Sequence, residues 1–438
     1  MVETHAKKRP GSIAVRFGDT QVTYSALQAL VDSTADDLLE RTTPGELTAW
    51  SVEEPVDALA TLLAAARTGR VAGPSDMAGM TLAAADHAPD PQPPFCVLRT
   101  AGVTGKPKSV ALGESTLTAV LVDVAERLEL LPGHRFLAPT PLSPGSAFAG
   151  LLLPLVAGAE LVLVSPQEAQ HLDLVQSRFQ RWRPAFALAP PAVWQRLLAA
   201  GWAGAPDLAV ISSGAPLPEP LARELASCTR AVWNAYGQVE TSVWASVGRF
   251  SSDENTVSVG PPVAGARLEV LDGALAALPD GESGELYVGG PIVSHGYAGP
   301  SGTADAHFVP DPRGKDATAR LFRTGDLAHR LPDGTIQVTG RREPVGVPAA
   351  SGPPAPVSEE AQVIADAWSD LLGILDPPVH ANFFELGGHS LAVMRLASRL
   401  QQAFGLPVPV ADLFENLTIA SQVDLVERLY EEQLAELS

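Results

Sequence analysis

The chain has 438 residues, of which 46% are hydrophobic, and its formal net charge is −20. This length is enough for two or three domains, and the acidic balance argues against nucleic acid as a partner because phosphate binding needs a basic surface. No apolar run is long enough to cross a membrane, and the N-terminus lacks the apolar segment of a signal peptide. The two cysteines, Cys96 and Cys228, fit a reducing cytoplasm, and we expect both to be small buried apolar side chains.

The N-terminal part of the chain alternates strand and helix signals. Residues 12–35 predict a hairpin followed by an amphipathic helix, and residues 55–70 predict a second helix. Residues 77–94 are rich in Pro and loosely patterned, and they end in the apolar run FCVLR.

Short apolar runs then alternate with helical patterns over residues 134–250, among them ELVLV, AFALAP, LAVISSG and AVWNAYG. Buried strands separated by helices indicate an α/β sheet covered on both faces. Residues 258–340 hold short alternating strands with Gly/Asp turns, which indicates a β-rich subdomain. Residues 344–357 have the composition of a linker, and from residue 358 the pattern is helical almost to the end.

The most specific motif is FFELGGHSLAVMRLASRL at residues 383–400. Gly387 and Gly388 permit a tight turn, and Ser390 then begins a helix. A serine at a helix N-terminus is well placed to carry a phosphodiester, since backbone N–H groups and the helix dipole favour an anion there; a simple N-cap is the alternative. The apolar positions expected to face a small core are Leu391, Met394 and Leu396.

Residues 358–430 closely resemble the peptidyl carrier proteins of nonribosomal peptide synthetases, whose motif reads L-G-G-H/D-S-L. The resemblance extends over a first helix (EEAQVIADAWSDLL), the segment DLFENLTI and a last helix. It implies an all-α four-helix carrier in which Ser390 receives a 4′-phosphopantetheine arm that holds an acyl group as a thioester. His389 is not expected to be catalytic, because carriers of this family also have Asp at that position.

A second set of motifs occupies the larger part of the chain. These motifs are TAGVTGKPKS (100–109), NAYGQVET (234–241), GELYVGG (284–290), GYAG (296–299), FRTGDL (322–327) and GR (340–341). A Gly-rich loop with Thr and Lys can wrap phosphates with its backbone N–H groups, although alone it is a weak signal. In this order, the six motifs resemble the adenylation domains of the same synthetases, within the adenylate-forming superfamily, over roughly residues 10–343.

The resemblance implies a site for ATP, AMP and Mg²⁺. Asn234 and Tyr236 would hold adenine, Asp326 and Arg341 the ribose, and Glu240 the Mg²⁺. The full set expected to bind nucleotide is Thr100, Gly102, Thr104, Gly105, Lys108, Gly214, Asn234, Tyr236, Gly237, Asp326 and Arg341. In the family reaction a substrate carboxylate attacks the α-phosphate of ATP, pyrophosphate leaves, and positioning with charge neutralisation does most of the work.

Several positions depart from the adenylation motifs. In the phosphate loop Ala101 and Val103 replace hydroxyl residues and Ser109 replaces a Gly. In the next motif Gln238 and Val239 stand where the family has Pro and Thr. Each lost hydroxyl could have contributed about 1.5–3 kcal/mol of hydrogen bonding to a charged phosphate, so weaker ATP handling is expected.

The expected acid pocket lacks the aspartate that pairs the α-ammonium in amino-acid-activating relatives, since no acidic residue occurs from Thr140 to Ala159. An unpaired buried ammonium is costly, which favours an aryl, aliphatic or unusual amino acid, or a pocket that no longer selects. The positions expected to line the pocket are Gly145, Ser146, Ala149, Ala192, Ile211, Ser213, Ala235, Val243 and Trp244.

The segment GRREPVGVPAASGPPAPVSEE (340–360) leads from hinge motif to carrier with nothing between. Relatives have a C-terminal subdomain of order a hundred residues there, which supplies a catalytic lysine. No lysine follows Lys315 in this chain, so that lysine is absent. The expected organisation is an adenylation core at 1–343, a flexible linker at 344–357 and a carrier at 358–438.

Two hypotheses remain open. In the first, the chain is an enzyme that activates a small carboxylic acid, with a missing subdomain that is dispensable or supplied in trans. In the second, the body is a non-catalytic scaffold for a carrier that a partner loads. Both imply a phosphopantetheinyl transferase and downstream or trans-acting synthetase enzymes as partners. Neither involves nucleic acid or membrane.

Overall fold

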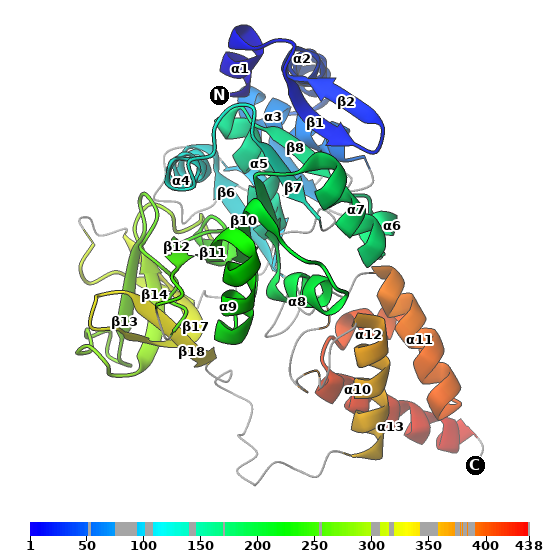
Figure 1. Ribbon diagram of the computed structural model, residues 1–438. Helices are drawn as coiled ribbons and strands as arrows, with labels where there is room; N and C mark the ends of the chain where they lie inside the picture. Colours follow the sequence, from blue (N-terminus) through cyan, green and yellow to red (C-terminus); the bar gives the residue numbers. More distant parts are fainter. Residues whose placement is uncertain are drawn as a thin grey trace. The chain divides into compact units, whose positions relative to one another are not determined.

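The structure, a computed structural model, describes the chain in segments. The described residues are 1–50, 54–74, 94–100, 108–139, 146–169, 171–253, 256–298, 307–314, 319–341, 358–372, 377, 379, 383 and 390–436. They form two compact units, one from the described residues up to 341 and one from those after 357 (Figure 1). The expected linker at 344–357 lies outside the described residues.

The first unit is built around an eight-stranded, mostly parallel sheet. Its strands, in spatial order, are β12 (Ser246–Phe250), β11 (Thr229–Tyr236), β10 (Ala205–Ser213), β9 (Phe186–Ala189), β7 (Arg135–Ala138), β8 (Glu160–Leu163), β1 (Ile13–Phe17) and β2 (Thr20–Thr23). The two end strands, β12 and β2, pair antiparallel with their neighbours. The predicted hairpin at the N-terminus is therefore one edge of this sheet.

Alternate residues of the central strands enter two separate apolar clusters. In β7, Phe136 and Ala138 belong to one cluster, whereas Leu137 belongs to the other. Successive strand residues point to opposite faces, so both faces of the sheet are buried, as predicted. The helices that contribute to the first cluster are α1 (Val2–Lys8), α2 (Tyr24–Arg41), α3 (Pro55–Thr68), α4 (Glu114–Arg127) and α5 (Ser146–Ala157). Those that contribute to the second are α7 (Leu172–Trp182), α8 (Pro191–Ala199) and α9 (Glu219–Cys228), with the short α6 (Pro166–Ala169) before them.

Two further five-stranded sheets complete the first unit. One has the order β15 (Tyr297–Ala298), β6 (Ser109–Gly113), β5 (Pro94–Arg99), β4 (Val71–Pro74) and β3 (Leu47–Trp50). The other is the predicted β-rich subdomain, with β13 (Arg267–Leu271), β14 (Gly284–Gly289), β17 (Arg320–Arg330) and β16 (Phe308–Pro310), and β18 (Ile336–Arg341) paired to β17. Antiparallel pairing brings Asp326 of β17 opposite Arg341 of β18. Two charged positions from separate motifs thus meet at one end of this sheet.

All the regular secondary structure among the described residues of the second unit is helical. Its helices are α10 (Glu359–Leu372), α11 (Ser390–Phe404), α12 (Val410–Glu415) and α13 (Ile419–Glu436). Their apolar faces form one core around Trp368, whose indole N–H donates to Gln422 Oε1 at 2.9 Å. The four-helix prediction for this part of the chain is confirmed.

Two predictions about side-chain burial are wrong in part. Leu396 is buried in the core of the second unit, but Met394 is 48% exposed. The residues of α11 that do face the core include Val393, Leu396 and Leu400, which recur at the three- and four-residue spacing of one helix face, and Met394 falls off that face. Of the two cysteines, Cys96 is buried, whereas Cys228 at the end of α9 is only half-buried.

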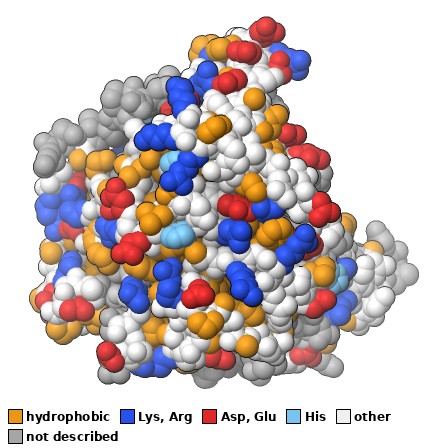
Figure 2. All heavy atoms as spheres, turned by 45° about the horizontal axis from the view of Figure 1, so that its top comes forward, with side chains coloured by type: hydrophobic (Ala, Val, Ile, Leu, Met, Phe, Trp, Pro, Cys, Tyr) orange, Lys and Arg blue, Asp and Glu red, His pale blue; other side chains and the backbone are white. Residues whose placement is uncertain are grey.

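The face of the molecule in Figure 2 shows acidic, basic and apolar side chains interspersed. None of the described helices is long and apolar enough to span a membrane. Within the described segments, no cluster of three or more His, Cys, Asp or Glu side chains could hold a metal ion.

Candidate functional site

The described motif residues of the first unit meet at the end of β11. Tyr236 is the last residue of this strand, and its hydroxyl donates to Asp326 Oδ2 at 2.6 Å. Arg341 Nε lies 3.9 Å from Asp326 Oδ1. Burial raises the pKa of Asp326, while the hydrogen bond from Tyr236 and the charge of Arg341 oppose that shift. Burial, followed by the charge of Asp326, also raises the pKa of Tyr236, so this hydroxyl stays a donor.

Backbone geometry holds Asp326 in this position. Gly325 has a φ of +77°, and Thr324 Oγ1 accepts a hydrogen bond from the Asp326 N–H at 3.0 Å while donating to Leu286 O at 2.7 Å. The pairing with β18 also shifts register between Leu327 and Ala328. The glycine in TGDL therefore provides a left-handed bend that other residues adopt only with strain.

Glu240 lies on the short 3-10 helix η2 (Val239–Thr241), one turn after Tyr236. Its Oε1 accepts a hydrogen bond from Tyr297 Oη at 3.0 Å. Lys108 Nζ lies 4.3 Å from the centroid of the same tyrosine ring, a cation–π contact. Burial raises the pKa of Glu240, and among the described residues no ion pair reaches this carboxylate. The charged form of Glu240 would thus gain from a bound cation.

The expected phosphate loop is closed at its base. Thr100 N donates to Lys108 O at 2.8 Å, and Lys108 N donates to Thr100 Oγ1 at 3.2 Å. The expected contacts Gly102, Thr104 and Gly105 lie outside the described residues. Among the described residues of this motif, Lys108 contacts the ring of Tyr297, whose hydroxyl donates to Glu240.

The remaining nucleotide positions lie at the carboxyl ends of β10 and β11. Asn234 Nδ2 donates to Ser258 O at 2.9 Å, which leaves its Oδ1 to accept. Gly214 has a φ of +91° directly after β10. A Cβ on Gly237 would lie 2.3 Å from Val243 O, so no larger residue fits there without a backbone shift. Gly214 thus allows a left-handed turn after β10, and Gly237 allows the loop at Val243 to approach the end of β11.

Most of the described positions expected to line the acid pocket come together. Ser213 pairs with Ala235 across β10 and β11, and Trp244 Nε1 donates to Ser213 Oγ at 2.9 Å. The fully or almost fully buried members of the set are Ala149, Ile211, Ser213, Ala235, Val243 and Trp244. Ala192, on α8, is only half-buried and belongs to neither large apolar cluster, Gly145 lies outside the described residues, and Ser146 begins α5.

The indole of Trp244 is positioned by an unusual turn. Ser242 and Val243 have φ values of +53° and +75°, and a positive φ is uncommon for a β-branched residue. Ser242 Oγ donates to Ile292 O at 2.8 Å, which anchors this turn. Such strain persists where the surroundings fix the conformation, and functional sites are a frequent place for it.

Ser390 is the first residue of α11 in the second unit, as the motif predicts. Gly387, Gly388 and His389 lie outside the described residues. Ser390 and the described nucleotide-site residues belong to different compact units.

Two residues of this site, Tyr297 and Gln238, have contacts that the sequence does not predict. Tyr297 lies within GYAG, and Gln238 is a departure from the family motif. The sequence signals are present, because both residues belong to recognisable motifs. What they contact depends on strand pairing that the motifs alone do not specify.

Two family models match the chain. The AMP-binding enzyme family matches residues 73–298, just over half of the chain, and the phosphopantetheine attachment site matches residues 362–426. The chain belongs to the AMP-binding enzyme family. The predicted adenylation-type body followed by a carrier-type module is confirmed, and with it the association with ATP or AMP and with phosphopantetheine.

The similar proteins are nonribosomal peptide synthetases. A linear gramicidin synthase polypeptide of Brevibacillus parabrevis is 25% identical over 98% of this chain and 7% of its own length. The dimodular nonribosomal peptide synthase of Bacillus subtilis is 25% identical over 75% of this chain and 18% of its own length. The chain spans less than a quarter of the length of the first curated relatives it matches.

Solved structures share the fold. The nonribosomal peptide synthetase FmoA3 (S1046A) has a TM-score of 0.65 and 24% identity, and the match covers 96% of this chain and 49% of that one. The N-terminal subdomain of Klebsiella oxytoca NpsA, in complex with 3-hydroxybenzoyl-AMSN, has a TM-score of 0.66 and 20% identity over 77% of this chain and 96% of that one.

Proposed function

We propose that this chain activates a carboxylic acid with ATP as an acyl-adenylate and carries the acyl group as a thioester on phosphopantetheinyl Ser390. The observation that supports the proposal is that four side chains gather at the carboxyl end of β11. They are Tyr236, Asp326, Arg341 and Glu240. These side chains come from three separate motifs. Together they offer an aromatic ring for a base, a carboxylate for ribose hydroxyls and a carboxylate for a cation.

Each group of the proposed site has a specific task. Asn234 Oδ1 would accept from the amino group of adenine, and Asp326 Oδ1 would accept from a ribose hydroxyl. Lys108 and the phosphate loop would neutralise charge on the phosphates. Holding the α-phosphate and the carboxylate in contact, with charge compensated, lowers the barrier more than any acid–base step would.

The residues of the proposed site also fit Mg²⁺, with Glu240 as its carboxylate ligand. Mg²⁺ usually takes one or two protein carboxylates and completes its octahedron with water and phosphate oxygens. Glu240 is such a single, buried carboxylate whose pKa is raised by burial. When bound, the ion would shield the charges of the triphosphate, while Tyr297 holds the orientation of Glu240.

The acid pocket favours a substrate without an α-ammonium group. Its described lining is apolar apart from Ser213, whose hydroxyl already accepts from Trp244. A cation placed there would be desolvated without an acidic partner. An aryl or aliphatic acid fits this lining better than an ordinary α-amino acid.

We infer an adenylation core at residues 1–343, a linker at 344–357 and a carrier at 358–438. The match to the gramicidin synthase extends over 581 positions, more than a hundred beyond the 438 residues of this chain, so part of that relative has no counterpart here. The NpsA complex is that of an N-terminal subdomain with an acyl-AMSN ligand. It supports binding at such a core without a C-terminal subdomain, whose lysine this chain would obtain in trans or do without.

A second candidate function is a non-catalytic scaffold whose carrier is loaded by a partner. The specific observation that favours it is the complete burial of Trp244 inside the expected acid pocket. A phosphopantetheinyl transferase and other synthetase enzymes are the partners in either case, and the ATP-dependent reaction is expected in the cytoplasm.

Pyrophosphate release distinguishes the two functions. The full chain with ATP and Mg²⁺ is given a panel of aryl and aliphatic acids, with an Asp326→Asn variant as the matched control. Acid-dependent pyrophosphate that is lost in the variant supports activation. Acid-independent background in both proteins, with no nucleotide binding by calorimetry, would support the scaffold.

A further inference from the structure

Gln238 follows Gly237 and precedes the turn that carries Glu240, at a position where the resembling domains have Pro. We propose that Gln238 is a positioning residue that holds the Asp326 carboxylate in its ribose-binding orientation and ties it to the turn of Glu240. This inference rests on the proposed function, because it assigns a role within the same nucleotide site.

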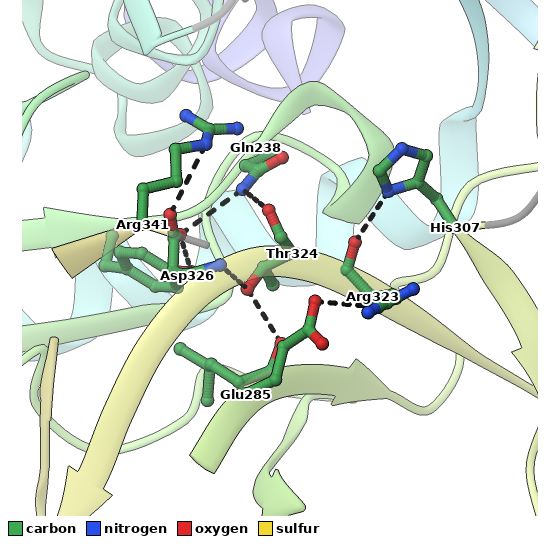
Figure 3. A network of polar contacts seen from close by, with 9 residues as sticks. Gln238, Glu285, His307, Arg323, Thr324, Asp326 and Arg341 are labelled. Carbon is green, nitrogen blue, oxygen red and sulfur yellow. Dashed lines mark hydrogen bonds and ion pairs between the residues drawn. The ribbon is translucent and has the colours of Figure 1, made fainter. Parts of the chain in front are cut away.

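The side chain of Gln238 bridges to the bend of β17. Its Nε2 donates to Thr324 O at 2.9 Å and to Asp326 Oδ2 at 3.4 Å, as Figure 3 shows. The amide group has two N–H bonds, so both contacts can form at once. The shorter bond fixes the amide, and the longer one places a donor beside the carboxylate.

The two carboxylate oxygens of Asp326 have different partners. Asp326 Oδ2 accepts from Tyr236 Oη at 2.6 Å as well as from Gln238. Asp326 Oδ1 faces Arg341 at 3.9 Å, beyond hydrogen-bond distance. One oxygen is thus held by the protein, and the other remains an acceptor for a ribose hydroxyl.

The backbone of Gln238 makes hydrogen bonds to the residues that follow it, Thr241 and Val243. Its N–H donates to Thr241 Oγ1 at 3.1 Å, and its carbonyl accepts from Thr241 N at 2.9 Å and from Val243 N at 3.1 Å. These bonds close the turn that contains Glu240. Proline has neither a backbone N–H nor a side-chain donor, so the family residue could make neither the contact to Thr241 Oγ1 nor those to β17.

Gln238 makes one hydrogen bond to the backbone of the bend of β17, at Thr324 O, but the bend also has hydrogen bonds of its own. Thr324 Oγ1 bonds to Leu286 O and to the Asp326 N–H, both within the β-rich subdomain. Removing the side-chain amide of Gln238 should therefore leave the bend folded and release the orientation of the carboxylate. This separates a positioning role from a structural one.

The test compares Gln238→Met, which keeps the length of the side chain but has no donor, with the unsubstituted chain. Calorimetry measures the binding of ATP and of 2′,3′-dideoxy-ATP in the presence of Mg²⁺. We expect Kd for ATP to rise about threefold to tenfold, as for the loss of one hydrogen bond of ordinary strength, and Kd for the dideoxynucleotide to stay unchanged. Gln337→Met, on the neighbouring β18, is the control and should change neither value.

The outcomes separate this inference from the proposed function. An equal loss of affinity for both nucleotides in Gln238→Met, or a loss for neither, would overturn the positioning role and leave the proposed function standing. No binding of either nucleotide by the unsubstituted chain would overturn both. Thermal unfolding of the ligand-free variants checks that all three proteins are folded, and a lower Tm confined to Gln238→Met would indicate a structural role instead.

Discussion

At the scale of single residues, the site combines buried polar groups with few partners. Trp244 and Ser213 satisfy each other inside an apolar cluster, and Glu240 has Tyr297 as its hydrogen-bond donor. Such groups contribute little net stability while paired, but each costs free energy once its partner is removed. Single substitutions can therefore distinguish the free energy that a hydrogen bond contributes from the free energy of burying the side chain.

We predict that Ser213→Ala lowers the free energy of unfolding by about 1–3 kcal/mol, because it leaves the Trp244 N–H buried without an acceptor. Urea denaturation measures the change. In the double variant Ser213→Ala with Trp244→Phe the loss should be smaller than the sum of the two single losses. Strict additivity of the two substitutions would show that the hydrogen bond contributes nothing.

We also predict a pH dependence from Glu240. Burial raises the pKa of this carboxyl above its ordinary value of 4.5, so the folded chain holds the proton to a higher pH than the unfolded chain does. Stability is then lost as pH rises from that ordinary value through the raised pKa. Glu240→Gln should gain stability relative to the unsubstituted chain over this window, by urea denaturation at several pH values without Mg²⁺. A constant difference between the two proteins would contradict this pH dependence.

At the scale of elements, the functional side chains lie where strands end. β10 and β11 terminate at Ser213 and Tyr236, and the antiparallel β17–β18 pair brings Asp326 opposite Arg341. Ligands of open α/β sheets usually bind at the carboxyl ends of the strands. The helices, by contrast, mainly cover the faces of the sheet and form the carrier core.

The face of α11 that contacts the carrier core gives a prediction at this scale. Leu396→Ala should destabilise the helical unit by about 2–5 kcal/mol, since it empties a fully buried position. Met394→Ala, two residues away but half exposed, should change stability by less than about 0.5 kcal/mol. Hydrogen exchange in peptides from 390–404 measures both, and equal protection in the two variants would contradict the assignment of this face.

Much of the architecture could be predicted from the sequence, because the spacing of apolar residues indicates helices and strands. Contacts between residues far apart in the chain could not be predicted in this way. Helix α10 matches the expected segment EEAQVIADAWSDLL because its apolar spacing is unambiguous. The prediction for Met394 is wrong because α11 also has apolar residues outside its buried face. The bridge from Gln238 to Asp326 joins positions 88 residues apart, and no local pattern indicates such a contact.

At the scale of the whole molecule, the chain joins an AMP-binding body to a phosphopantetheine attachment module. The expected roles of Asp326 and Ser390 belong to successive steps, activation and capture of the same acyl group. A tether between the units would let the carrier reach the site that makes the adenylate. We therefore predict that this one polypeptide carries out both steps.

The most direct test of that claim is the intact mass of the phosphopantetheinylated chain after incubation with ATP, Mg²⁺ and a panel of aryl and aliphatic acids. We predict a mass increase equal to one acyl group for at least one acid, absent without ATP and absent in Ser390→Ala. If no acid gives an increase while the pantetheine arm is present on the unsubstituted chain, the isolated chain does not load itself, and self-loading by this protein is contradicted.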